Sequence, residues 1–171
     1  MAKPKTSAHL TENLFSSNNE IVLKTINTVR DNGNVEYLPF LFKLLESNTD
    51  KIVKNSVYEL LCDIKKESAV PFFIEALNSI SDTENKKLLV SACWQSGLSF
   101  DNYLEIFIDI LINDKLELAI EAFSVIENGQ NDFSVFEIEE SLEKLSADFY
   151  EISDVKKPLI SELINILNNA L

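Results

Sequence analysis

The chain has 171 residues and a hydrophobic content of 46%, enough apolar material to bury a sizeable core. Its net charge of −13 argues against binding the phosphate backbone of nucleic acids, which requires lysine and arginine. Three glycines and four prolines are too few for the many tight turns of an all-β protein, so an all-α fold is expected.

The first seventeen residues are expected to lie outside the main domain. Residues 1–9 are polar and aperiodic, which predicts a frayed tail. Residues 10–15 are expected to form a short helix, the remnant of a preceding repeat, that covers the end of the domain. His9, in the tail, is the single histidine of the chain and makes no metal site by itself. The remaining residues, 18–171, are expected to form one domain.

One apolar pattern occurs four times along this domain. The copies are residues 38–45, 70–77, 104–111 and 138–145, with offsets of 32, 34 and 34 positions. Each copy places apolar residues at i, i+3, i+4 and i+7, which is one face of an α-helix. The fourth copy is weaker because Ser141 stands at its i+3 place. Self-similarity at this period predicts a right-handed α-solenoid of about four helical hairpins and a C-terminal capping helix.

The expected helices alternate between two layers of the stack. In chain order they span about 20–30, 36–46, 50–64, 69–80, 84–96, 101–112, 115–127, 134–149 and 155–169. Proline fits only the first turn of a helix, so Pro39 implies a helix that starts near Glu36, and Ser68 is expected to cap the helix that contains Pro71. One continuous core is expected to bury the equivalent residues Phe42, Ile74, Ile108 and Leu142.

The repeats resemble those of the HEAT family. The resemblance rests on paired helices, on a proline early in the second helix, and on residues 50–60 (DKIVKNSVYEL), a turn followed by Val-basic-x-small-apolar. The family prefers Arg where Lys54 stands and Ala where Ser56 stands, and Glu105 and Glu139 occupy the proline place of the later repeats. The resemblance covers roughly residues 18–146 and implies a binding scaffold whose second helices line a concave surface.

No motif for catalysis or for cofactor binding occurs in the chain. It lacks a glycine-rich phosphate loop, a Cys-x-x-Cys pair and a nucleophile elbow, so catalytic, cofactor-binding and metal-binding residues are expected to be none. Cys62 and Cys93 are interpreted as small hydrophobic residues of the core. No apolar run is long enough to span a bilayer and no signal peptide precedes the domain, so neither nucleic acid nor membrane is an expected partner and a cytoplasmic location is expected.

The charge is concentrated in the C-terminal part. Residues 101–171 contain four basic and sixteen acidic side chains, a net charge of −12. In the expected repeats the acidic residues fall at two equivalent places of successive second helices, which would align them into a strip on one face. The expected partner-binding residues of this strip are Glu75, Glu105, Asp109, Glu139 and Glu143. Tyr103, and after it Tyr37, are the expected aromatic anchors beside the strip.

The sequence therefore predicts a non-catalytic protein-binding scaffold that takes a basic protein or peptide on an acidic helix face. Two alternatives stay open. One is an enzyme similar to the HEAT-like DNA glycosylases for alkylated bases, which would need a basic concave surface. The other is a module similar to the phycobilin lyases, which would need an exposed Cys or His for a tetrapyrrole. The acidic strip could also serve only to keep the protein in solution.

Overall fold

The computed structural model describes residues 7–129 and 131–171, and all regular structure within them is helical. The expected all-α fold is confirmed, and each of the nine expected helices has a counterpart at nearly the same bounds. Contacts between residues divide the chain into two compact units, Met1–Leu98 (unit 1) and Ser99–Leu171 (unit 2). The single domain spanning 18–171 stays a prediction.

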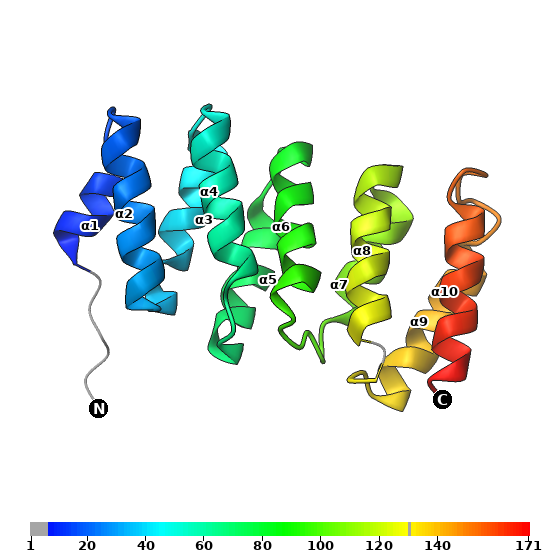
Figure 1. Cartoon of the computed structure of the whole chain (residues 1–171). Helices are drawn as coiled ribbons and strands as arrows, with labels where there is room; N and C mark the ends of the chain where they lie inside the picture. The colour runs from blue at the N-terminus through cyan, green and yellow to red at the C-terminus, as the bar shows by residue number, and fades with distance from the viewer. Residues whose placement is uncertain (1–6, 130) are drawn as a thin grey trace. The chain divides into compact units, whose positions relative to one another are not determined.

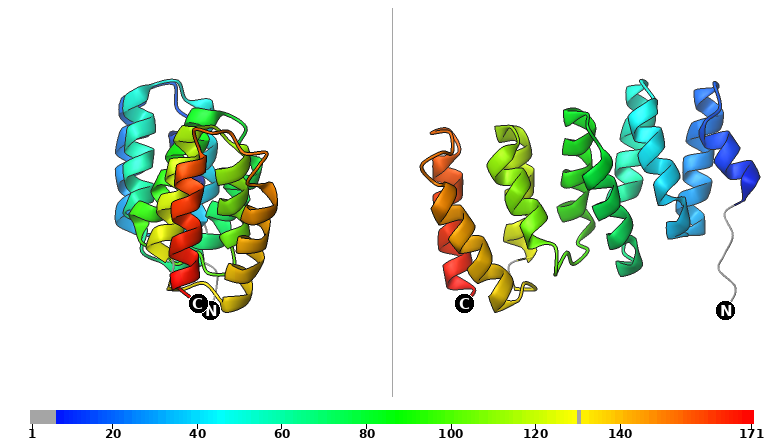
Figure 2. Two further views of the ribbon diagram at one scale, coloured as in Figure 1. Left: turned by 90° about the vertical axis from the view of Figure 1, so that its right-hand side faces the viewer. Right: turned by 180° about the vertical axis from the view of Figure 1, so that it is seen from behind.

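Unit 1 is built from two layers of helices (Figures 1 and 2). The helices are α1 (Ala8–Leu14), α2 (Asn19–Asn32), α3 (Leu38–Ser47), α4 (Lys51–Cys62), α5 (Val70–Ser79) and α6 (Thr83–Ser96). In one layer α2 packs on α4 and α4 packs on α6, while α1, α3 and α5 contact one another in the same order in the second layer. This is the two-layer alternation that the apolar register predicts for these residues.

Unit 2 repeats the arrangement with four helices. They are α7 (Leu104–Asn113), α8 (Leu116–Gly129), α9 (Val135–Asp148) and α10 (Lys157–Asn169). Helix α7 packs on α8 and on α9, and α10 packs on both α8 and α9. The pairs α7–α9 and α8–α10 therefore form two layers within this unit. None of the helices in the described ranges has the length and apolar character that crossing a membrane requires.

The starts of the helices follow from capping side chains and from proline. Asn18, Asp50, Asp82 and Ser134 each accept a hydrogen bond from a main-chain N–H in the first turn of the helix that follows. Asn34 caps a short 3₁₀ turn, Val35–Tyr37, and α3 then begins at Leu38 with Pro39 in its first turn. The residue directly before the proline starts the helix, so the missing N–H breaks no bond.

The expected cap at Ser68 is wrong. Ser68 lies inside a second 3₁₀ turn, Glu67–Ala69, and α5 begins directly after it at Val70, again with its proline in the first turn. The residue in the capping place of α5 is Ala69, which already has helical backbone angles and offers no side-chain acceptor. The 3₁₀ turn supplies the first main-chain hydrogen bonds, so a serine cap is not needed.

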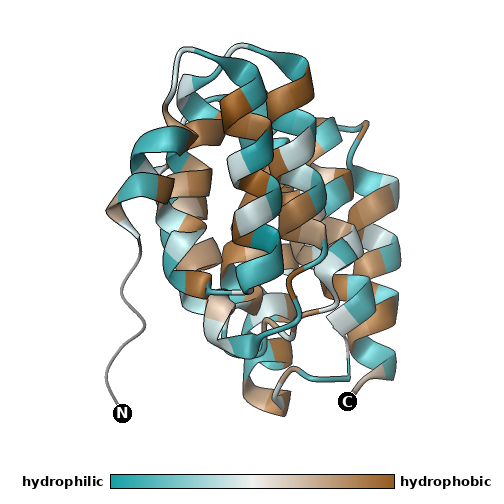
Figure 3. Ribbon diagram, turned by 60° about the vertical axis from the view of Figure 1, so that its left-hand side comes forward, coloured by the Kyte–Doolittle hydropathy of each residue, from teal (hydrophilic) through white to brown (hydrophobic). Residues whose placement is uncertain are grey.

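Each helix has an apolar side and a polar side, seen as brown and teal bands in Figure 3. Phe42, Ile74 and Ile108 are buried as expected, whereas Leu142 is only half-buried. Leu142 lies on α9, which has α7 as its neighbour in its own layer but no further helix of unit 2 on the other side. Fewer neighbours cover it, and the expectation of burial at this place is wrong.

Polar side chains join neighbouring helices of unit 1. Asn19 on α2 donates to the carboxylate of Asp50 over 2.7 Å, and Lys54 on α4 donates to the side-chain oxygen of Asn85 on α6, also over 2.7 Å. Partners in both pairs are 31 positions apart. Because Asp50 also caps α4, the same carboxylate starts one helix and holds the preceding one.

Two adjacent lysines after α4 cap the C-terminal ends of both neighbouring helices. The ammonium of Lys66 donates to the main-chain oxygen of Gly33 at the end of α2, and that of Lys65 donates to the oxygen of Ser96 at the end of α6. The last carbonyls of a helix have no partner within it and carry partial negative charge, so a cation stabilises them. Gly33 itself ends α2 in the left-handed conformation, with φ of 57°.

Unit 2 contains a buried lysine that performs the same task. Lys156 precedes α10, and its ammonium donates to the main-chain oxygens of Leu111 at 3.0 Å, of Asp114 at 2.9 Å, and of Ile112. These three carbonyls belong to the C-terminal end of α7. Only 6% of Lys156 is exposed, and this burial lowers the pKa of its ammonium, with Asp114 acting in the opposite direction.

The N-terminal helix begins earlier than expected. Helix α1 starts at Ala8, so His9 is exposed on a helix, where its Nε2 lies 3.2 Å from the side-chain nitrogen of Asn13. Residues 1–6 of the expected tail lie outside the described residues. Tyr37 is buried, and its hydroxyl accepts a hydrogen bond from the main-chain N–H of Ser7 over 2.8 Å. Tyr37 is therefore not available as a surface anchor for a partner.

Candidate functional site

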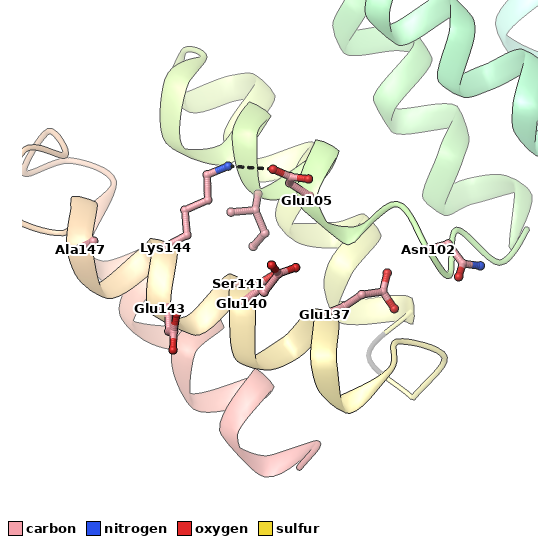
Figure 4. Close-up of a pocket in the computed structure, with 9 residues that line it drawn as sticks. Asn102, Glu105, Glu137, Glu140, Ser141, Glu143, Lys144 and Ala147 are labelled. Atoms are coloured by element: carbon pink, nitrogen blue, oxygen red, sulfur yellow. Dashed lines mark hydrogen bonds and ion pairs between the residues drawn. The ribbon is translucent and has the colours of Figure 1, made fainter.

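A cavity of about 540 Å³ opens between α7 and α9 in unit 2. Figure 4 shows its lining, which comes from both helices and from the turn before α7, with Lys144 and Glu105 facing each other across the space and Glu143 pointing away from them. The lining residues are Asn102, Glu105, Ile108, Glu137, Glu140, Ser141, Glu143, Lys144 and Ala147. Four of these nine side chains are glutamates, and one is a lysine. We refer to this site, with its nine lining residues, as the acidic cavity.

Lys144 joins the two helices across the acidic cavity. Its ammonium lies 2.6 Å from a carboxylate oxygen of Asp109 and 3.5 Å from one of Glu105, both on α7. The hydrogen bond to Asp109, more than the attraction of Glu105, raises the pKa of Lys144. Lys144 therefore stays charged at neutral pH and compensates one of the negative charges beside the cavity.

The predicted site residues are only partly brought together. Glu105 and Glu143 line the acidic cavity, and Asp109 contributes through its ion pair with Lys144. Glu139 is exposed on α9 but does not line the cavity, and Tyr103 is half-buried at the start of α7, outside the lining. Glu75 is exposed on α5, in unit 1. Its alignment with the residues of unit 2 in one strip stays a prediction.

Seven of the nine lining residues were not among the predicted site residues, and the charged ones among the seven are Glu137, Glu140 and Lys144. Glu137, Glu140 and Lys144 share one face of α9 because they follow one another at helical spacing. Glu137 also completes a capping box, in which its carboxylate accepts from the main-chain N–H of Ser134 over 3.0 Å. Asn102 lies in the turn before α7 with φ of 67°, which asparagine tolerates better than most residues. The helical spacing from Glu137 to Lys144 could have been read from the sequence; the conformation of Asn102 could not.

Unit 2 has many more acidic than basic side chains, and three of its four lysines are already paired or buried. Its net charge is −12, since Ser99 and Phe100 add none to that of residues 101–171. Of its four lysines, Lys144 is paired with α7, Lys156 is buried on main-chain carbonyls, and Lys157 lies 2.7 Å from Asp154. The surface potential around the acidic cavity is therefore negative.

The described residues supply little chemistry beyond charge. Residues 7–129 and 131–171 contain no group of three His, Cys, Asp or Glu side chains placed to hold a metal ion. Cys93 is fully buried and Cys62 is half-buried, and desolvation raises the pKa of both thiols. Both cysteines are free, and the inner one, Cys93, packs in the core as expected.

Replacing Lys144 by glutamine tests the charge balance of the acidic cavity. Removing its positive charge makes the cavity more negative, so the association rate of a lysine-rich peptide should rise about two- to threefold at low salt. The rise should vanish at about 0.3 M salt, where the field is screened within a few ångströms. Stopped-flow fluorescence with a labelled peptide measures the rate, and the free energy of unfolding should change by no more than about 1 kcal/mol because the pair of Lys144 and Asp109 is only partly buried. A rate that does not respond would show that Lys144 does not tune the cavity.

Comparison with known proteins supports the fold alone. No protein-family model matches the chain, and neither does any curated protein. A crystal structure of an engineered protein from the Northeast Structural Genomics Consortium is similar, with a TM-score of 0.51 and 15% sequence identity. The alignment covers 94% of this chain and 78% of that one. At this identity the likeness concerns the backbone and not the site. The chain is similar in its all-helical fold to that engineered protein.

Proposed function

We propose that the chain is a non-catalytic cytoplasmic scaffold that binds a basic protein or peptide in the acidic cavity of unit 2. The observation that carries the proposal is the presence of four glutamates of α7 and α9 in the lining of one cavity, with a single lysine that is already paired. Such a surface attracts lysine and arginine side chains and raises their association rate. The cavity gives those side chains a concave place to bind.

The architecture we propose for the scaffold is a right-handed α-solenoid of HEAT-like hairpins. Three findings support it. The apolar pattern recurs at offsets of 32 and 34 positions, the helices alternate between two layers within each unit, and polar partners of unit 1 are separated by nearly the same period. In a solenoid each repeat contacts its neighbours only, and equivalent positions form rows available to an extended partner.

Phe136 is the apolar anchor that we propose beside the acidic cavity. It is 67% exposed near the start of α9, four positions before Glu140 and therefore on a neighbouring part of the same helix face. Val135 beside it is exposed as well. Exposed charges mainly affect the rate of encounter, whereas a desolvated aromatic side chain slows dissociation. Phe136 takes the role that the sequence assigns to Tyr103.

The test uses a short lysine-rich peptide with one leucine, labelled for stopped-flow fluorescence. The variant with Glu105, Glu140 and Glu143 changed to glutamine should bind it about tenfold more slowly at low salt, because the steering charge is removed. Phe136→Ala should raise the dissociation rate and leave the association rate nearly unchanged. Both effects are read from the same traces.

A matched control removes the same charge from the other layer of unit 2. Glu117, Glu127 and Glu162 are exposed on α8 and α10, and none of them lines the acidic cavity. Their change to glutamine should slow association far less than the cavity variant does. Equal slowing by the two variants would mean that net charge alone attracts the peptide, and the acidic residues would then serve solubility.

A further inference from the structure

A second cavity, of about 220 Å³, lies wholly within unit 1. It is formed by the C-terminal ends of α2 and α4, the residues that follow them, and the beginning of α3, whose positions Figure 1 shows. Its walls are aliphatic: Val29, Val35, Leu38, Leu41, Leu60 and Ile64. Pockets for drug-sized molecules usually measure about 300–1,000 Å³, so this cavity suits a ligand with one small apolar group.

The polar part of the lining is mostly cationic. Arg30, Lys65 and Lys66 all belong to it, with Asp63 as the single anion. In a chain with 15 basic and 28 acidic residues, three cations at one cavity are an unusual concentration. Lys65 and Lys66 each use one donor on a helix end, which leaves each ammonium two further N–H groups.

Arg30 is held loosely, and one of its donors has no acceptor. Its terminal nitrogen lies 3.5 Å from the carboxylate of Asp63, which is long for a charged hydrogen bond. Its Nε is buried and has no hydrogen-bond partner among the described residues. A buried donor without an acceptor is costly, and a ligand that supplies an acceptor at this place recovers that cost.

The balance of charge at this cavity favours an anion. The C-terminal ends of α2 and α4 each carry about half a negative charge, and Asp63 carries one more. The end of α6, to which Lys65 donates, adds another half, so the three cationic side chains leave an excess of about half a positive charge. The donors also lack matching acceptors, because the side-chain oxygen of Asn34 already accepts from Glu36. This set of groups suits a carboxylate better than a peptide backbone, which needs both donors and acceptors.

We infer that this cavity binds a free monocarboxylate with one small apolar chain. The aliphatic walls receive the chain, and the carboxylate lies at the rim, where it accepts from Arg30 and from the ammonium group of Lys66. This site is separate in residues and in ligand chemistry from the acidic cavity of unit 2. The inference stands or falls independently of the proposed protein-binding function.

The experiment titrates the ¹⁵N-labelled full chain with N-acetyl-leucine and follows amide chemical shifts. Shifts should appear at the lining residues, with an affinity of about 0.1–1 mM, as suits a ligand of this size. N-acetyl-leucine amide has the same apolar chain without the charge, and acetate has the charge without the chain. Each should bind at least about tenfold more weakly. These comparisons use the wild-type protein and do not depend on the folding of any variant.

Variants locate the ligand within the site. Arg30→Met should weaken binding of N-acetyl-leucine at least about tenfold, and Val35→Phe, which fills the cavity, should abolish it. Lys24→Met is the matched control, because it removes an exposed cation of α2 that does not line the cavity, and it should leave binding unchanged. Equal binding of the acid and the amide would overturn the inference. So would much tighter binding of a peptide that ends in leucine, because the ligand would then be a polypeptide terminus.

Discussion

Replacing Phe73 by alanine is expected to lower the free energy of unfolding of unit 1 by about 3–5 kcal/mol. Phe73 on α5 is completely buried, and its ring meets that of Phe42 on α3 edge to face, with the centroids 5.5 Å apart. The substitution removes a large apolar side chain from two packed helices and leaves a space that the surrounding side chains cannot fill. Urea denaturation followed by circular dichroism measures the loss.

The neighbouring Phe72 provides the control for this prediction. It is half-buried on the same helix, so Phe72→Ala should cost clearly less than Phe73→Ala. Hydrogen exchange on Phe73→Ala then shows which helices lose amide protection. Amides of α3 and α5 should lose protection first, while amides of α10, which has no part in this cluster, should keep it. A uniform loss of protection in all helices would contradict a repeat architecture.

Replacing Lys156 by methionine is expected to destabilise unit 2 by about 2–3 kcal/mol. Methionine keeps most of the apolar stem, but the three carbonyls at the end of α7 lose their common donor. Buried acceptors without a donor cost about 1–3 kcal/mol each, and water that reaches the helix end recovers part of this cost. Denaturation of the variant measures the change, and hydrogen exchange should show α7 fraying at its C-terminal end.

Lys157→Met separates this effect from a general effect of charge. Lys157 is adjacent in the chain, but it pairs with the highly exposed Asp154, so its loss should cost less than about 1 kcal/mol. If Lys156→Met and Lys157→Met lower the free energy of unfolding equally, the hydrogen bonds from Lys156 to the end of α7 contribute no additional stability. The comparison needs no other change in sequence, because the two lysines follow one another.

The lowered pKa of Lys156 determines the direction in which its contribution to stability changes with pH. Burial lowers the pKa of the folded state below the usual value of 10.5, so at alkaline pH the unfolded chain binds more protons than the folded one. Stability contributed by Lys156 should therefore rise as the pH increases from the folded-state pKa toward 10.5. The difference in unfolding free energy between wild type and Lys156→Met should widen over this range. A difference that narrows would contradict the direction of the shift.

The helices could be predicted from the sequence because their apolar registers are local. Leu38, Leu41 and Leu45 lie on one face of one helix whatever packs against it, and all three are buried. Partners that are far apart in the chain could not be predicted in the same way. Tyr37 is buried because it bonds to Ser7, and Leu142 is half-buried because α9 has few neighbours. Both outcomes depend on helices that periodicity does not place.

The candidate site could be predicted from the sequence only where its residues follow a local helical pattern. Glu105 and Glu143, two residues of the expected strip, both line the acidic cavity, and that a partner binds there stays a prediction. The sequence did not reveal that Lys144 reaches Asp109, because ion pairs between helices depend on the rotation of each helix about its axis. The aliphatic cavity of unit 1 was missed altogether. Its cations come from the ends of two helices, and no local pattern brings Arg30 and Lys66 together.

The N-caps and the polar pairs between α2, α4 and α6 affect whether the chain can gain or lose a helix pair in evolution. Asp82 caps α6 as Asp50 caps α4, and the two residues stand 32 positions apart. Loss of residues 50–81 through unequal recombination would place Asp82 where Asp50 was, with its carboxylate facing Asn19. A duplication of the same residues would insert a helix pair that brings its own N-terminal cap, but Lys54 of the first copy would then face Val53 of the second copy instead of Asn85. The aspartate caps therefore tolerate the gain or loss of this stretch, whereas the pair formed by Lys54 and Asn85 would need a compensating mutation.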